Sequence, residues 1–125
     1  MITNFEEITE DLTNVELSYI ETIKSYLLGV LSYSPIKQGI LCFMINNYLM
    51  QMEGNPQIAF TPIRLRKFIN YFRSNGILPI IATSDGCTIN YDTHEIAKQI
   101  KSLEQRAASI LKASEGLKKI LNDLP

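Results

Sequence analysis

Hydrophobic residues recur along most of this chain at intervals of three and four, the spacing that gathers them on one face of a helix. This pattern predicts four helices, at residues 13–33, 35–52, 62–75 and 92–125. Residues 78–91 follow a different pattern, in which two short runs of β-forming residues flank Ser84-Asp85-Gly86 and predict a two-stranded hairpin. The expected fold class is therefore mainly α with a small β-hairpin (α+β).

The helix predicted at residues 62–75 has recognisable signals at both ends. Thr61 can accept a hydrogen bond from a free N–H group of the first turn, and Pro62 suits the first helical position. Gly76 can adopt the left-handed conformation that ends a helix. The apolar face of this helix is formed by Leu65, Phe68, Ile69 and Phe72.

The rest of the surface of this helix is basic and carries no acidic residue. Its polar residues include Arg64, Arg66, Lys67, Asn70 and Arg73. Because these positions lie away from the apolar face, we expect Arg64 and Lys67 to point outward together with Asn70 and Tyr71. A helix with such a surface suits a polyanion as its ligand.

Residues 57–60, between the second and third helices, are predicted as a short strand that pairs with the hairpin. Pro79 restricts the first hairpin strand, because proline is found only at the start or on an edge of a strand. In the hairpin, Asp85-Gly86 is expected to supply the positive φ angles of a tight two-residue turn.

The run Leu65 to Gly76, followed by Ile80 to Gly86, by Glu95-Ile96 and by Arg106-Ala107, resembles small winged helix-turn-helix proteins encoded in phage and prophage genomes. The resemblance extends over about residues 36–121. It implies a winged-helix core at residues 35–91, an acidic N-terminal segment and helix at 1–34, and a long coiled-coil-like helix at 92–125. Helix 35–52 would be the first helix of the core, and helix 62–75 its recognition helix. Two departures are Cys87, where an aromatic residue usually follows the wing glycine, and the reduction of the usual preceding helix to residues 57–60.

Two further helix starts are marked in the N-terminal half. Thr13 and Glu16 have the spacing of a capping box, and Ser34-Pro35 combines a cap residue with a proline. The core face expected for helix 35–52 consists of Ile36, Ile40, Phe43, Met44, Tyr48 and Leu49, and it is widened by Leu41, Cys42 and Ile45. The methionines of this helix are expected to fill gaps in the core.

The C-terminal helix carries a heptad seam, in which apolar residues alternate at spacings of four and three. Its members are Ile96, Ile100, Leu103, Ala107, Ile110, Leu117 and Leu121, with Ser114 as the one polar position. Such a seam needs a partner, either the helix at residues 15–31 or the same helix of a second subunit. A homodimer is the leading interpretation and a monomeric helical hairpin the alternative.

The composition is that of a globular protein, with 46% hydrophobic and 20% charged residues in a length of 125 residues. No apolar run approaches the roughly 20 residues of a membrane span, and the N-terminus lacks the pattern of a signal peptide. We therefore expect a cytoplasmic protein without a membrane partner, in the host cytoplasm if it is viral.

Charge is unevenly distributed along the chain. Residues 1–60 carry two basic and seven acidic residues, a charge of −5, whereas residues 61–125 carry ten basic and six acidic residues, a charge of +4. The acidic residues 1–12 are either an arm that shields the basic helix or meets a partner, or an ordinary solvated terminus. The basic half could face nucleic acid.

The sequence has few residues suited to catalysis or metal binding. His94 is the one histidine, and Cys42 and Cys87 are expected to be unpaired thiols. No glycine-rich phosphate loop is present. We therefore expect a protein that is not an enzyme and has no catalytic residues, no metal and no cofactor.

Two functions are consistent with these features. The first is binding of double-stranded DNA in phage-type control of replication or transcription, with the helix at residues 62–75 in the major groove. Its DNA-binding residues would be Arg64, Arg66, Lys67, Asn70, Tyr71, Arg73 and, at the tip of the wing, Ser84. The alternative is a winged-helix protein-interaction module that binds a host or replisome protein without DNA.

Overall fold

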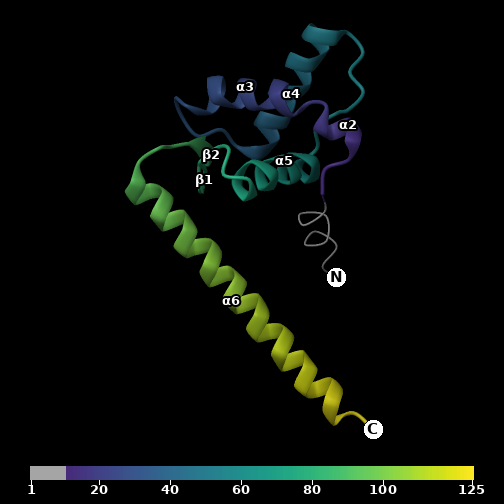
Figure 1. Cartoon of the computed structure of the whole chain (residues 1–125), viewed down its shortest axis with the longest axis vertical. Coiled ribbons are helices and arrows are strands. Elements are labelled where there is room, and N and C mark those ends of the chain that lie inside the picture. The colour runs from purple at the N-terminus through teal and green to yellow at the C-terminus, as the bar shows by residue number, and fades with distance from the viewer. Residues whose placement is uncertain (1–10) are drawn as a thin grey trace. The chain divides into compact units, whose positions relative to one another are not determined.

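The computed structural model describes residues 11–125 as two compact units, which divide between Tyr91 and Asp92 (Figure 1). The helices are α2 (Asn14–Leu17), α3 (Ile20–Leu31), α4 (Gln38–Glu53), α5 (Pro62–Ser74) and α6 (Thr93–Asp123), and the strands are β1 (Ile80–Thr83) and β2 (Gly86–Ile89). The prediction of a mainly helical chain with one hairpin and a long C-terminal helix is confirmed. The acidic arm predicted at residues 1–12 lies, apart from Asp11 and Leu12, outside the described residues.

The helix predicted over residues 13–33 is two helices, α2 and α3, separated by a turn at Ser18 and Tyr19. The capping box at the start of α2 is confirmed, since Thr13 and Glu16 each accept a hydrogen bond from the other's backbone N–H. Tyr19 is buried, and its hydroxyl donates to Glu53 and accepts from the N–H of Gln57, both at 2.9 Å. The turn between α2 and α3 thus directs the Tyr19 side chain toward the C-terminal end of α4.

Helix α4 begins at Gln38 with Lys37 as its N-cap, so the start predicted at Ser34-Pro35 is wrong. Its buried residues are Leu41, Cys42, Ile45 and Leu49. Ile40 and Phe43, which were expected in the core, expose 57% and 67% of their surface, and Met50 and Met52 are exposed as well. Because α4 is apolar on both sides, the spacing of its hydrophobic residues could not identify the buried side.

The strand predicted at residues 57–60 is not present. The side-chain amide of Asn46 on α4 accepts a hydrogen bond from the backbone N–H of Phe60 and donates one to its carbonyl, so these groups need no strand partner. The backbone of Ile36 instead pairs with Cys87 of β2 through two hydrogen bonds of 2.9 Å. The backbone segment that pairs with the hairpin therefore comes before α4 in the sequence and not after it.

The ends of α5 form as predicted. Thr61 accepts a hydrogen bond from the N–H of Arg64, and Gly76 has a φ angle of 63°. The N–H of Ile77 then returns to the carbonyl of Phe72 at 2.8 Å, which closes the helix. The predicted apolar face of α5 is buried. It joins residues of α3 and α4 in one core.

The antiparallel hairpin pairs Ile80 with Ile89 and Thr83 with Gly86, which leaves Ser84 and Asp85 as its loop. Neither loop residue has a positive φ angle, so the turn type predicted from Asp85-Gly86 is wrong. Gly86 has a φ angle of 125°, and a β-carbon there would overlap the backbone of Ile36. The hairpin lies against the C-terminal ends of α3 and α5, because Thr88 donates to the carbonyl of Leu31 and Arg73 to that of Ile80.

Helix α6, the second unit, starts at the N-cap Asp92, which accepts a hydrogen bond from the N–H of His94. Glu95, in the first turn of α6, makes a 3.5 Å ion pair with Lys98. No residue of α6 is buried, and its large exposed hydrophobic residues are Ile100, Ile110, Leu111, Leu117, Ile120 and Leu121. Ile96 and Leu103 of the predicted seam are half-buried.

Candidate nucleic-acid interface

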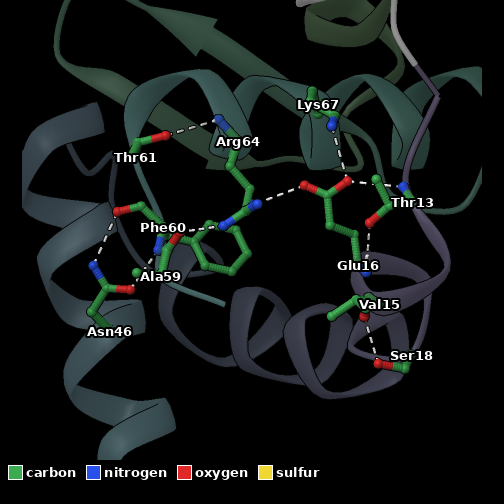
Figure 2. A network of polar contacts seen from close by, with 10 residues as sticks. All are labelled: Thr13, Val15, Glu16, Ser18, Asn46, Ala59, Phe60, Thr61, Arg64 and Lys67. Carbon is green, nitrogen blue, oxygen red and sulfur yellow. Dashed lines mark hydrogen bonds and ion pairs between the residues drawn. The ribbon is translucent and has the colours of Figure 1, made fainter. Parts of the chain in front are cut away.

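Glu16 of α2 lies against the N-terminal half of α5 and contacts two of the basic residues predicted to bind DNA (Figure 2). One carboxylate oxygen, Oε2, accepts a hydrogen bond from Nε of Arg64 at 2.6 Å. The other, Oε1, accepts from Nζ of Lys67 at 2.9 Å. Glu16 is only 1% exposed, which makes this a buried ion-pair cluster rather than a surface contact.

Further hydrogen bonds fix the positions of the Glu16 carboxylate and of the Arg64 guanidinium in this cluster. The capping box at the start of α2 directs the Glu16 side chain back along its helix, where the N–H of Thr13 donates to Oε1 at 2.9 Å. Arg64 is held from the other side, because its second guanidinium nitrogen donates to the carbonyl of Ala59 at 2.8 Å. Arg64 and Lys67 are three residues apart on α5 and therefore reach one carboxylate together.

The charge state of Glu16 follows from these contacts. Burial alone would raise the pKa of its carboxyl group, but the hydrogen bonds from Thr13, Lys67 and Arg64 outweigh burial and lower the pKa to about 2. Glu16 is thus ionised at neutral pH and compensates the charge of one of its two basic partners.

The outer face of α5 differs from the predicted one. At 100° per residue, the positions opposite the buried face are Ile63, Lys67, Asn70 and Ser74. Ile63, Asn70 and Ser74 are exposed, whereas the side chain of Lys67 is only 11% exposed beside Glu16. The side chain of Arg64, on the flank of the helix, is 33% exposed. The expectation that Arg64 and Lys67 point freely outward is therefore corrected, because α2 lies over this part of the helix.

The other predicted DNA-binding residues are spread around α5 and the hairpin. Arg66 is half-buried on the flank that faces α4, where it opposes the rise that burial causes in the pKa of the Cys42 thiol. Arg73 donates from Nε to the carbonyl of Ile80 at 2.9 Å and so fastens α5 to β1. Tyr71 is half-buried, and its ring meets that of Phe72 edge-on. Ser84 is exposed in the hairpin loop.

A shallow pocket of about 100 Å³ lies over the outer face of α5, next to the Glu16 cluster. It is lined by Asp11, Leu12, Lys67, Asn70, Tyr71, Ser74 and Asn75. Asp11 and Leu12 come from the segment that leads into α2, so the chain before α2 also passes beside this face. The structure thus brings together Lys67, Asn70 and Tyr71 of the predicted site, with an acidic residue among them.

The sequence did not reveal the role of Glu16. The capping box identified this residue as a helix-start signal, which is correct, but nothing local indicated that its carboxylate also reaches residues 48 and 51 positions later. The available signal was indirect: α5 has four basic residues and no acid of its own, so a partly buried α5 needs a carboxylate from elsewhere.

Comparison of the chain with protein families, with characterised proteins and with solved structures gives no match. Across residues 11–125, none of the helices has the length and apolar character needed to cross a membrane. Within the same residues, His, Cys, Asp and Glu side chains do not form a group of three that could hold a metal ion.

Proposed function

We propose that this protein is a winged-helix protein that binds double-stranded DNA through α5 and the adjacent hairpin. The element order supports this proposal: α3, the strand-like residue Ile36, α4, α5 and then β1 and β2. The bridge between Ile36 and Cys87 places a third backbone segment beside the hairpin, as in a three-stranded wing sheet. In this arrangement α3 is the first helix of the core and α4 the helix before the recognition helix, which revises the assignment made from the sequence.

The observation that carries the proposal is the outer face of α5, which presents Asn70 and Ser74 with Arg66 on its flank and no acid of its own. Arginine pairs with guanine and asparagine with adenine through two hydrogen bonds each, whereas serine contacts phosphate. Ser84 would bring the hairpin loop to the backbone beside the groove. The role would be control of replication or transcription.

A homodimer belongs to this proposal. The apolar seam of α6 gives two copies of the chain a surface on which to pair, and two copies would carry two α5 helices to two half-sites. Ala107 and Ser114 are the small residues of the seam and would allow close approach of the two helices.

The test is fluorescence anisotropy with a labelled mixed-sequence duplex, comparing wild type with Arg66→Ala and Asn70→Ala. We expect each variant to weaken binding about five- to a hundredfold, because each removes a group suited to paired hydrogen bonds with a base. Lys24→Ala, which removes one positive charge from α3 of the same unit, is the matched control and should bind nearly as wild type does. Equal affinity of all four proteins would remove α5 from the DNA interface.

A second candidate function, a protein-interaction module that binds a host or replisome protein, is favoured by a different observation. The side of α4 away from the core exposes Ile40, Phe43 and Met50, and exposed apolar residues in such numbers on one helix suit a protein contact. Absence of DNA binding by wild type at low salt would favour this alternative.

A further inference from the structure

We propose that Arg64 and Lys67 form a phosphate-binding site of α5 that Glu16 occupies in the free protein and that a DNA phosphate takes over when α2 moves away. This inference rests on the proposed DNA binding and adds its regulation. In the free protein, α2 would act as an internal competitor of DNA.

The chemistry of the cluster matches that of a phosphate contact. A guanidinium and an ammonium group converge on two oxygens of one anion, at 2.6 Å and 2.9 Å. Arginine and lysine bind phosphate oxygens through the same charge-assisted hydrogen bonds. The Glu16 carboxylate therefore occupies the place where these two side chains would hold a phosphate.

The position of the cluster makes competition with DNA direct. Lys67 lies on the outer face of α5, about one turn before Asn70 and two turns before Ser74. The N-terminal part of a recognition helix is the part that contacts base edges. Asp11 lines the pocket on the same face. A duplex that reached this part of α5 would meet two carboxylates, so α2 and the residues before it must move for full contact.

Helix α2 is a single turn of four residues, of which only Glu16 is buried. Leu12 before the helix and Tyr19 after it are buried in the core, so α2 opens by releasing Leu12 together with the Glu16 cluster while Tyr19 stays in place. Val15 and Leu17 expose 42% and 41% of their surface. A segment with so few buried contacts can open locally while α3, α4 and α5 keep their common core.

The test compares DNA binding by wild type and by Glu16→Gln over a series of salt concentrations. Glutamine keeps the size of the side chain and removes its charge, so α2 should open more readily and free both cations. We expect Glu16→Gln to bind DNA at least about tenfold more tightly at low salt. The slope of log affinity against log salt should stay the same, because Arg64 and Lys67 contact phosphate in the DNA complexes of both proteins.

The triple variant Glu16→Gln, Arg64→Ala, Lys67→Ala is the control for this gain. If Glu16 acts by occupying the two basic side chains, the gain in affinity should disappear in the triple variant. Equal affinity of wild type and Glu16→Gln, with both proteins bound to DNA, would overturn the inference and leave the proposed function intact. Absence of DNA binding by both proteins would overturn the proposed function and the inference with it.

Hydrogen exchange of the wild-type protein gives a second test that needs no variant. The N–H of Leu17 is bonded to the carbonyl of Thr13 at 2.8 Å and reports on whether α2 is closed. Saturating DNA should accelerate its exchange while Ile23 and Leu27 of the α3 core stay protected. Unchanged or slower exchange of Leu17 in the DNA complex would contradict the opening of α2.

Discussion

Besides its contact with the basic residues of α5, Glu16 of α2 contributes to the stability of the fold. A carboxylate this deeply buried is costly unless it is paired, and here two cations and a backbone N–H pair with it. Removing its charge leaves the Arg64 and Lys67 side chains without that partner. The stability of the fold should therefore depend on pH through this residue.

Acid should weaken the fold through Glu16, in a direction that follows from its lowered pKa. The folded protein holds the pKa of Glu16 at about 2, below its ordinary value of 4.5, so the ionised group stabilises the fold above about pH 4.5. This contribution, at most about 3 kcal/mol by the linkage between pKa and stability, should be lost as pH falls from 4.5 toward 2. Urea unfolding of wild type and Glu16→Gln at several pH values measures it.

The stability difference between these two proteins should shrink over that pH interval, because protonated Glu16 and glutamine are both neutral. A difference that stayed constant from neutral pH to about pH 2.5 would contradict the ion-pair interpretation.

At the scale of helices and strands, the sequence predicted the features that depend on neighbouring residues in the chain. The caps of α5, the capping box of α2 and the two strands depend on a few adjacent residues, and they form nearly where predicted. The buried side of α4 was not predictable, because Ile40 and Phe43 are as apolar as Leu41 and Ile45. The absence of a strand at residues 57–60 was not predictable either, because the backbone of this segment is hydrogen-bonded by the side chain of Asn46 on α4.

Asn46 should therefore be important for the connection between α4 and α5. Asn46→Ala removes both hydrogen bonds to the Phe60 backbone, and we expect a loss of about 2–4 kcal/mol in the free energy of unfolding. The exposed neighbour Asn47 offers a matched control, since Asn47→Ala should change stability by less than about 0.5 kcal/mol. Chemical denaturation of both variants measures the difference; similar values for the two would show that Asn46 does not hold this segment.

The candidate site illustrates the same division between local and distant information. The sequence located α5 and its basic residues correctly, because helix periodicity and capping are local properties. It could not show that Arg64 and Lys67 meet Glu16, or that Arg73 bonds to Ile80, because these contacts depend on how α2 and β1 pack against α5.

At the scale of the whole molecule, self-association through α6 is the main expectation. Leu103 lies on the seam of this helix, and an aspartate there would place a charge in the contact between two subunits. We expect Leu103→Asp to be a monomer in light scattering at a concentration where wild type is a dimer. Ser102→Asp, one residue away and off the seam, should stay dimeric; a dimer in both variants would place the contact elsewhere.

The salt dependence of DNA binding by the wild-type protein tests most directly whether α5 is a DNA-binding helix. Affinity for a mixed-sequence duplex should be determined between about 50 and 200 mM salt, because phosphate contacts release counterions and make binding steeply dependent on salt over this range. We expect binding at the low end that weakens at least about tenfold across the series. No binding at the low end, or binding that does not change with salt, would contradict the assignment of α5 as a DNA-binding helix.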